Sequence, residues 1–408
     1  MSTHINIKRT PVISRCNITV PASKSESNRA LIIQALAGKG IINNLSTARD
    51  TITMYKLLRS DAHVLDVIDA GTTMRFLTAY LAVTGQERTI TGTKRMCERP
   101  IGILVDALTQ LGARIDFTEK EGYPPLQIRG FKSSGIDKLQ IRGDVSSQYI
   151  SAILMISPML EKGLTLTLKG KIGSRPYINM TLGIMKHFGV DTKFEKNIIY
   201  IPRQTYHDAT FNVDPDWSGA SYWYSVVALA ENADILLNGF SLPSFQGDSK
   251  IRDIMSDLGV ASEFNDNGLQ LSKSNHKEKV KIDFSDIPDL AQTVAVVCSA
   301  KGIYAQMTGL ESLRIKETDR ITALQHELLK LNSRLIEKKP GEWHLIPARQ
   351  GTIPDSLSFN TYDDHRMAMA LAPLATMANL QIEDPSVVEK SYPSYWEDLA
   401  RAGFQIVF

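Results

Sequence analysis

Hydrophobic and polar positions along the chain recur in a pattern of amphipathic helix, glycine or similar break, and short strand. The clearest copies are at residues 105–117, 183–194 and 252–264. Weaker copies are at residues 52–67, 324–336 and 398–408. Glycine suits the end of a helix because it readily adopts the left-handed backbone conformation. In chain order, the copies from residue 105 onward recur at roughly 70 residues, which predicts about six repeats of one α/β unit.

A second set of helical segments is apolar on nearly all sides, which is typical of buried helices. These segments are residues 27–36, 72–83, 147–159, 218–229, 288–300 and 365–377. Each follows a polar or glycine-containing stretch. A repeated unit would put these helix starts at equivalent places, where their free N–H groups and partial positive charge favour anions. The pattern therefore predicts an anion-binding site.

Composition narrows the class of protein. With 408 residues and 43% hydrophobic content, the chain can bury a large core, and its length suggests two or three domains. The formal charge of +2 gives no global excess for holding nucleic acid or an anionic membrane. Anion binding must therefore come from local clusters of cations.

The cysteines and the apolar runs indicate the compartment. Cys16, Cys97 and Cys298 are far apart with no CxxC pair, which argues against disulfides, a zinc site or an iron–sulfur cluster. The first 17 residues lack the continuous apolar stretch of a secretory signal. The longest uncharged apolar run, residues 367–380, is about 14 residues and too short to span a bilayer. We expect a cytoplasmic protein with no metal and no membrane association.

Charged and polar residues gather at several helix starts. In PASKSESNR, Lys24, Ser25 and Arg29 would share one side of a helix, where lysine and arginine can bind phosphate or carboxylate. In DAGTTMR, Gly71 would let a ligand approach the backbone closely. Either stretch can also be an ordinary helix start with solvated charges. Three further motifs also have ordinary interpretations. KRMCERP can be charge on a solvated helix face, RIKETDR can be a ladder of ion pairs along a helix, and YDDHR can be a set of helix caps.

Taken in order, these segments resemble the EPSP synthases. The matching stretches are PASKSESNRAL, DAGTTMR, KRMCERPIG, SSQYISAILM, GSRPYINMT, IPD, RIKETDR, TYDDHRMAM and EKSYPSYW, from Lys24 to Trp396. The resemblance implies the α/β, two-domain enolpyruvyl transferase fold, an inside-out α/β barrel in which each domain has three repeats with buried helices and outer sheets. One domain would span residues 21–214 and the other residues 1–20 plus 215–408, with the active site in the interdomain cleft.

The same resemblance implies transfer of the enolpyruvyl group of phosphoenolpyruvate to the 5-hydroxyl of shikimate 3-phosphate by addition and elimination, a step toward chorismate. It implies a monomer without cofactor that is a target of glyphosate. Asp289 would be the base for the hydroxyl, Glu317 would move the proton at C3, and Lys24 and Lys390 would stabilise the departing phosphate.

The implied binding residues form two sets. Shikimate 3-phosphate would contact Lys24, Ser25, Arg29, Ser146, Ser147, Gln148, Ser174, Tyr177, Asp289, Ser312 and Lys316. Phosphoenolpyruvate would contact Lys24, Gly71, Arg99, Gln148, Arg320, Arg366 and Lys390. Arg75 would support the loop rather than bind substrate.

The sequence departs from the family pattern at four places. Asp69 stands where asparagine is usual, Phe76 where proline is, Cys97 where lysine is and Ser312 where asparagine is. With Gly71 kept, we expect ordinary glyphosate sensitivity. The first repeat is also short between residues 58 and 69, so we expect its sheet to be trimmed.

Three other functions fit the sequence less well. A UDP-N-acetylglucosamine enolpyruvyl transferase would share the fold, but it would have Lys-Asn in place of Lys24-Ser25 and no KETDR. A non-catalytic protein that binds anions or nucleic acid fits poorly with the near-neutral charge and with Asp289 and Glu317. A nucleotide phosphotransferase is disfavoured because neither GxxxxGK[ST] nor GxGxxG occurs.

Overall fold

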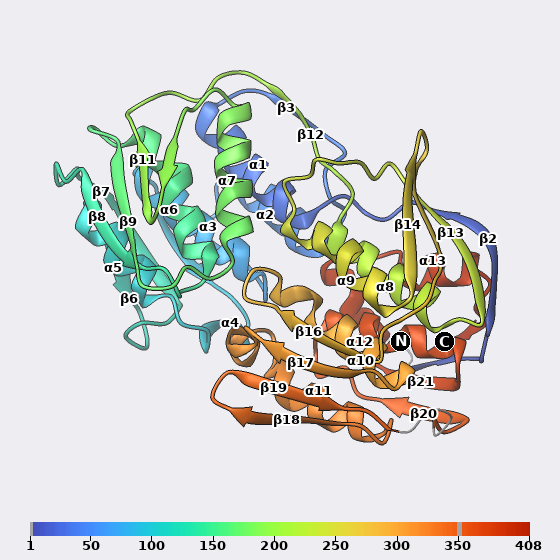
Figure 1. Cartoon of the computed structure of the whole chain (residues 1–408). Helices are drawn as coiled ribbons and strands as arrows, with labels where there is room; N and C mark the ends of the chain where they lie inside the picture. Colours follow the sequence, from blue (N-terminus) through green and yellow to red (C-terminus); the bar gives the residue numbers. More distant parts are fainter. Residues whose placement is uncertain (1–2, 349–352) are drawn as a thin grey trace. The chain divides into compact units, whose positions relative to one another are not determined.

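The computed structural model describes residues 3–348 and 353–408. The chain divides into two compact units (Figure 1). The discontinuous unit comprises Met1–Pro21 and Asp214–Phe408, and the continuous unit comprises Ala22–Val213. Each unit has its own hydrophobic core.

The continuous unit alternates helices and short strands. Its helices are α1 (Lys24–Ala37), α2 (Arg49–Leu57), α3 (Gly71–Val83), α4 (Lys94–Cys97), α5 (Gly102–Leu111), α6 (Ser147–Ile156), η1 (Ser157–Met159) and α7 (Arg175–His187). Its strands are β3 (Ile41–Asn43), β4 (Val64–Asp66), β5 (Glu87–Thr91), β6 (Ala113–Phe117), β7 (Leu126–Phe131), β8 (Lys138–Arg142), β9 (Leu164–Lys169), β10 (Lys193–Glu195), β11 (Ile198–Ile201) and β12 (Thr210–Asn212).

The discontinuous unit has the same alternation. Its helices are α8 (Trp217–Leu229), η2 (Gly247–Lys250), α9 (Ile251–Leu258), η3 (Pro288–Leu290), α10 (Ala291–Lys301), η4 (Glu311–Ile315), α11 (Arg320–Leu329), α12 (His365–Leu371), η5 (Ala372–Thr376), η6 (Pro385–Lys390) and α13 (Tyr395–Arg401). Its strands are β1 (His4–Ile7), β2 (Val12–Ile18), β13 (Asn232–Asn238), β14 (Val260–Asn265), β15 (Gly268–Lys273), β16 (Lys279–Asp283), β17 (Tyr304–Thr308), β18 (Arg334–Lys339), β19 (Glu342–Ile346), β20 (Ser356–Phe359), β21 (Asn379–Glu383) and β22 (Ile406–Val407).

The sheets confirm the predicted repeat. Four sheets share one strand order, in which two parallel strands are followed by two antiparallel ones: β4-β5-β7-β6, β8-β9-β11-β10, β2-β13-β15-β14 and β16-β17-β19-β18. A fifth sheet, β20-β21-β1-β22, has the same pairing, with the N-terminal strand β1 in the third place. In the sheet β4-β5-β7-β6, α3 joins the two parallel strands and α5 leads into the antiparallel pair.

The sheet of the first repeat is trimmed, as expected. It consists of β3 and β12 alone, paired in parallel from Ile41 and Thr210. The strand that follows α2, β4, pairs with β5 and so belongs to the next sheet. The short connection after α2 leaves no residues for a hairpin of its own.

All six predicted apolar segments form helices at the centre of their units. Every residue of α8 is buried, and α10 is buried from Ala291 to Ala300. The segments at 147–159 and 365–377 end as the 3-10 helices η1 and η5, where Pro158 and Pro373 supply no backbone N–H for the α-helical ladder. Among the described residues, no helix is both long enough and apolar enough to cross a membrane.

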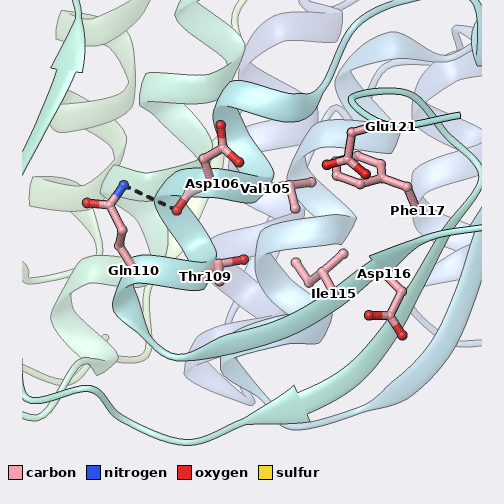
Figure 2. A pocket seen from close by; sticks show the side chains of 8 residues that line it. All are labelled: Val105, Asp106, Thr109, Gln110, Ile115, Asp116, Phe117 and Glu121. Carbon is pink, nitrogen blue, oxygen red and sulfur yellow. Dashed lines mark hydrogen bonds between the residues drawn. The ribbon is translucent and has the colours of Figure 1, made fainter.

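An open groove of about 560 Å³ lies on the continuous unit beside α5 and β6 (Figure 2). It is lined by Val105, Asp106, Thr109, Gln110, Ile115, Asp116, Phe117 and Glu121. The Gln110 side chain donates to the Asp106 carbonyl oxygen at 3.3 Å along the wall. The residues that the sequence predicts for substrate binding are not part of this lining.

Candidate active site

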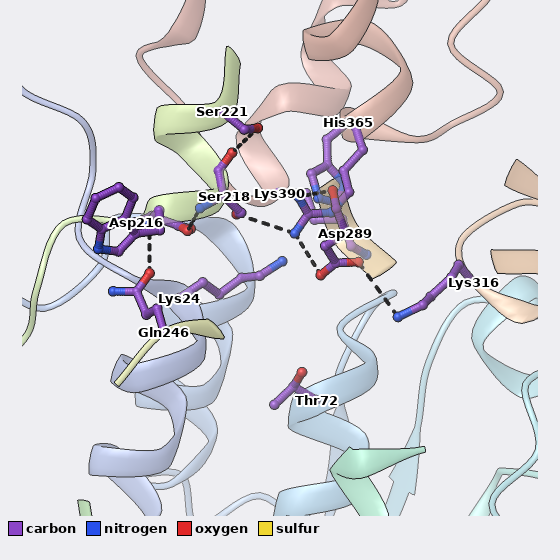
Figure 3. A network of polar contacts seen from close by, with 12 residues as sticks. Lys24, Thr72, Asp216, Ser218, Ser221, Gln246, Asp289, Lys316, His365 and Lys390 are labelled. Atoms are coloured by element: carbon purple, nitrogen blue, oxygen red, sulfur yellow. Dashed lines mark hydrogen bonds and ion pairs between the residues drawn. The ribbon is translucent and has the colours of Figure 1, made fainter. Parts of the chain in front are cut away.

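Asp289 is the centre of a charged cluster in the discontinuous unit (Figure 3). It lies in η3, directly before the buried helix α10. Its Oδ1 accepts from Arg320 Nη1 at 3.2 Å and lies 3.7 Å from Lys316 Nζ, and its Oδ2 accepts from Arg366 Nη2 at 2.9 Å. Three cations from two separate stretches of the chain therefore meet at one carboxylate.

The surroundings of Asp289 fix its charge. Burial by itself raises the pKa of this carboxyl, but Arg366, Lys316 and Arg320 outweigh burial and hold the pKa well below its ordinary value. Burial lowers the pKa of Lys316, and Asp289 opposes that change. Asp289 is thus a carboxylate, and its oxygens can accept hydrogen bonds.

Arg320 is a deeply buried cation of the cluster, with its side chain 2% exposed. Its Nε donates to Asp364 Oδ2 at 2.6 Å, and its Nη2 donates to Glu317 Oε2 at 2.9 Å. Burial alone would lower the Arg320 pKa, but Asp364, Glu317 and Asp289 raise it above its ordinary value. Asp319 caps the start of α11 and so sets where Arg320 enters the site.

Glu317 lies between two cations. Besides the bond from Arg320, its Oε1 lies 3.7 Å from Lys390 Nζ, and the Lys390 side chain is 2% exposed. Among these residues, four cations therefore surround the carboxylates of Asp289, Glu317 and Asp364, which leaves one net positive charge. Such a cluster favours an added anion.

Arg366 is held by residues that sequence reasoning missed. Its Nη1 donates to the Tyr222 hydroxyl at 3.3 Å and its Nη2 to the Ser218 hydroxyl at 3.4 Å, both on α8. Asp364 caps α12 by accepting from the Arg366 backbone N–H at 2.8 Å. Ser218 lies in a polar helix start that the sequence pattern singled out, so the signal for it was present.

Ser312 is exposed on η4, four residues before Lys316. Its predicted contact with shikimate 3-phosphate remains a prediction. Among the described residues, no group of three or more His, Cys, Asp or Glu side chains is arranged to hold a metal ion.

The continuous unit brings the remaining predicted residues to the starts of its buried helices. Lys24 begins α1, and its Nζ pairs with Asp50 Oδ2 on α2 at 3.3 Å. Asp50 is another residue that sequence reasoning missed. Ser25 follows Lys24 in the first turn of α1, and its carbonyl oxygen accepts from Arg29 Nη1 at 2.9 Å.

Arg29 is buried among hydroxyls and rings. Its Nε donates to Thr181 Oγ1 at 2.7 Å and its Nη2 to Ser151 Oγ at 3.0 Å. Its guanidinium carbon lies 5.4 Å from the centre of the Phe76 ring and 5.8 Å from that of Tyr177. Burial lowers the Arg29 pKa to about 10, which Tyr177 and Glu26 partly oppose.

The start of α3 brings together three predicted residues. The Arg99 guanidinium lies against Gly71, with Nη1 2.8 Å from the place where a Cβ would be. Gln148, at the start of α6, donates to Thr72 Oγ1 at 3.0 Å. Arg75 donates to the carbonyl oxygens of Gly71 at 3.1 Å and Pro100 at 2.9 Å, so it supports this loop as expected.

The last predicted residues lie at the starts of α6 and α7, which are neighbours. Ser146 caps α6 by accepting from the Gln148 N–H at 3.3 Å, and Ser147 is the first residue of that helix. Ser174 precedes α7 with φ of 52°, and Tyr177 follows in its first turn. Their hydroxyls suit a polyhydroxy ligand.

The departures from the family pattern also have local partners. The Asp69 carboxylate pairs with Arg49 Nη2 at 3.2 Å, which balances its extra negative charge. Phe76 is 1% exposed within the core of the continuous unit. Cys97 is partly buried, with its Sγ 3.7 Å from the Gly92 carbonyl oxygen.

Comparison with known proteins identifies the family. The family model described as EPSP synthase (3-phosphoshikimate 1-carboxyvinyltransferase) matches residues 59–399. A 3-phosphoshikimate 1-carboxyvinyltransferase of Bacteroides fragilis strain ATCC 25285 is 50% identical over 399 residues, covering 96% of both chains. The protein of that name from Yersinia pestis strain Angola is 35% identical over 415 aligned positions, covering 94% of this chain and 95% of its own.

The solved structures agree with this result. An EPSP synthase structure from Acinetobacter baumannii superposes with a TM-score of 0.80 over 100% of both chains at 21% identity. A second structure from that organism gives 0.79 over 99% of both chains at 20% identity. These likenesses confirm the two-domain enolpyruvyl transferase fold. The chain belongs to the EPSP synthase family.

Proposed function

We propose that this protein is a 3-phosphoshikimate 1-carboxyvinyltransferase, which transfers the carboxyvinyl group of phosphoenolpyruvate to the 5-hydroxyl of shikimate 3-phosphate. The observation that carries the proposal is the 50% identity over 96% of both chains to a relative of that name. The charged cluster around Asp289 suits it, because the two substrates bring roughly six negative charges.

The substrates are bound by the charged cluster around Asp289 and by side chains of the continuous unit. Arg320, Arg366 and Lys390 bind phosphoenolpyruvate together with Arg99, Gln148, Lys24 and the Gly71 backbone. Shikimate 3-phosphate is bound by Lys316, Asp289 and Ser312 and by the hydroxyl-rich helix starts of the continuous unit, with Lys24, Ser25, Arg29 and Gln148. The arginine forks match carboxylate and phosphate, and the hydroxyls match the sugar-like ring.

In the addition step, the 5-hydroxyl oxygen bonds to C2 of phosphoenolpyruvate, its proton passes to Asp289, and C3 gains a proton. In the elimination step, C3 loses a proton, the double bond forms again, and the bond from C2 to the phosphate oxygen breaks. Glu317, between Arg320 and Lys390, handles the C3 proton. Lys24 and Lys390 stabilise charge on the departing phosphate.

Substrate binding would strengthen Asp289 as a base. Its low pKa comes from Arg366, Lys316 and Arg320. Anionic groups of the substrates compete for these cations, so their binding weakens the positive field and raises the Asp289 pKa. The base therefore becomes competent when the hydroxyl is in place.

We also propose that the enzyme is a cytoplasmic monomer with ordinary sensitivity to glyphosate. The Arg49 partner of Asp69 supports this sensitivity, because the pair leaves little extra charge near Gly71. An inhibition curve for phosphoenolpyruvate turnover tests it. Full activity at glyphosate concentrations that stop typical family members would overturn the proposal.

The function is tested by phosphate release from purified protein given phosphoenolpyruvate with either shikimate 3-phosphate or UDP-N-acetylglucosamine. We expect release with shikimate 3-phosphate alone. Release with the sugar nucleotide alone would instead support the UDP-N-acetylglucosamine enolpyruvyl transferase. Absence of release with both would support a non-catalytic anion-binding protein.

A further inference from the structure

We propose that Glu327 and Tyr362 are positioning residues for Arg320, which they orient through the turn that carries Asp364. This inference rests on the proposed function, in which Arg320 binds phosphoenolpyruvate. Neither residue touches the Asp289 carboxylate in the contacts described above. Their effect would pass through one hydrogen bond and one short stretch of backbone.

The turn before α12 has an unusual backbone. Tyr362 has φ of 56° and Asp363 has φ of 54°, so two consecutive residues other than glycine are left-handed. Side chains disfavour this conformation, so contacts outside the turn must hold it. The Asp364 N–H donates to the Thr361 carbonyl oxygen at 3.0 Å across the turn.

Helix α11 supplies those outside contacts at two points. The Tyr362 hydroxyl donates to Glu327 Oε1 at 2.6 Å, and the Asn360 N–H donates to Glu327 Oε2 at 3.4 Å. Asp364, at the other end of the turn, accepts from Arg320 Nε at 2.6 Å. Arg320 and Glu327 are two helical turns apart, on the same face of α11.

Burial restricts the movement of the side chains that make these contacts. The Glu327 side chain is fully buried, and Lys330 Nζ lies 2.7 Å from its Oε2. This ion pair supplies the opposite charge that a buried carboxylate requires and leaves Oε1 for the Tyr362 hydroxyl. Asp364 is also fully buried, so it has little room to turn independently of the backbone.

Asp364 transmits the position of the turn to the site. Its carboxylate accepts from Arg320 Nε and also from the Arg366 backbone N–H at the start of α12. The plane of an arginine fork decides whether it can bind an anion with two parallel hydrogen bonds. A shift of the turn would therefore rotate the Arg320 fork, while a merely structural bond between Tyr362 and Glu327 would affect stability alone.

The test compares wild type with Tyr362→Phe, which removes the hydroxyl and keeps the ring. Steady-state kinetics should give a KM for phosphoenolpyruvate about fivefold higher and an unchanged KM for shikimate 3-phosphate, since one hydrogen bond is lost. In NMR spectra, hydrogen exchange of the Arg320 Nε–H should also be about fivefold faster. Arg320→Lys, which lacks that group, assigns the resonance.

Two further variants sharpen the result. Tyr206→Phe is the matched control, because it removes a hydroxyl that donates to the Met155 carbonyl oxygen at 2.8 Å in the other unit. It should change neither quantity. Glu327→Met, which removes both acceptor oxygens, should act in the same direction as Tyr362→Phe. The double variant should be no worse than the stronger single variant, because the hydrogen bond between the two residues is absent in each.

Unchanged Arg320 exchange and an unchanged KM for phosphoenolpyruvate in folded Tyr362→Phe would overturn the inference, even if the variant were less stable. Absence of enolpyruvyl transfer by wild type would refute the proposed function instead. In that case the exchange measurement still decides whether Tyr362 and Glu327 position Arg320.

Discussion

The Arg366 guanidinium donates to the Asp289 carboxylate at 2.9 Å and to the Asp289 backbone carbonyl oxygen at 3.3 Å. The start of α12 is thereby joined to η3, which precedes α10. In the proposed reaction, one of these residues binds phosphoenolpyruvate and the other receives the proton of the acceptor hydroxyl. Binding of one substrate and activation of the other are therefore linked at this contact.

Asp289→Asn should lower kcat by about 10²- to 10⁴-fold, because an amide of the same shape cannot take up the proton. Phosphate release measures the loss, and circular dichroism checks the fold. Asp286→Asn is the matched control, since Asp286 is three residues away and pairs with Lys250 at 3.7 Å. Near-normal kcat in Asp289→Asn would exclude this residue as the base.

Binding of shikimate 3-phosphate at acidic pH should be accompanied by greater proton uptake in wild type than in Asp289→Asn. The sign follows from the electrostatics: an anion beside Lys316 and the arginines raises the pKa of Asp289, and a group whose pKa rises binds more protons. Calorimetry in buffers of different ionisation enthalpy measures the uptake. Equal uptake by the two proteins would contradict this tuning of the base.

Gly71→Ala should raise the KM for phosphoenolpyruvate on the order of tenfold or more, because the new methyl group would fall 2.8 Å from Arg99 Nη1 and displace the guanidinium. Gly173→Ala is the control for an added methyl group, since its Cβ would meet nothing within 4 Å. Steady-state kinetics with varied phosphoenolpyruvate make the comparison. A normal KM in Gly71→Ala would show that Arg99 does not bind there.

Lys301 should make the free energy of unfolding rise with pH between about 8 and 10.5. Burial and the nearby Lys273 lower its pKa from 10.5 to about 8 in the folded protein. In this range the unfolded chain binds more protons, so stability grows as pH rises. Urea unfolding of wild type and Lys301→Met at several pH values tests this. The slope should be smaller in the variant, and an identical slope would contradict the prediction.

Much of the fold could be predicted from sequence, because its signals are local. The repeat was predictable from helices that end at Gly112 and Gly259 with left-handed backbone, and the buried set from the mainly apolar helices α8 and α10. Element ends were less accurate. The first apolar helix begins three residues earlier than predicted because Ser23, rather than a later residue, accepts from the Glu26 N–H as its cap.

The charged partners of the site were harder to predict because they come from distant parts of the chain. Asp50 contacts Lys24 across 26 positions, and Tyr222 contacts Arg366 across 144. No local periodicity records such pairs. The cations themselves were predicted because the family motifs place them at helix starts, whereas their buried partners resemble ordinary core or cap residues in sequence.

The central claim is transfer of the carboxyvinyl group to the shikimate 3-phosphate hydroxyl. It is tested most directly by NMR of a reaction with phosphoenolpyruvate labelled with carbon-13 at C2. The account predicts that the label appears as the vinyl ether carbon of an adduct with shikimate 3-phosphate, in equal amount to the inorganic phosphate released. Appearance of the label in pyruvate with no ether product would contradict it.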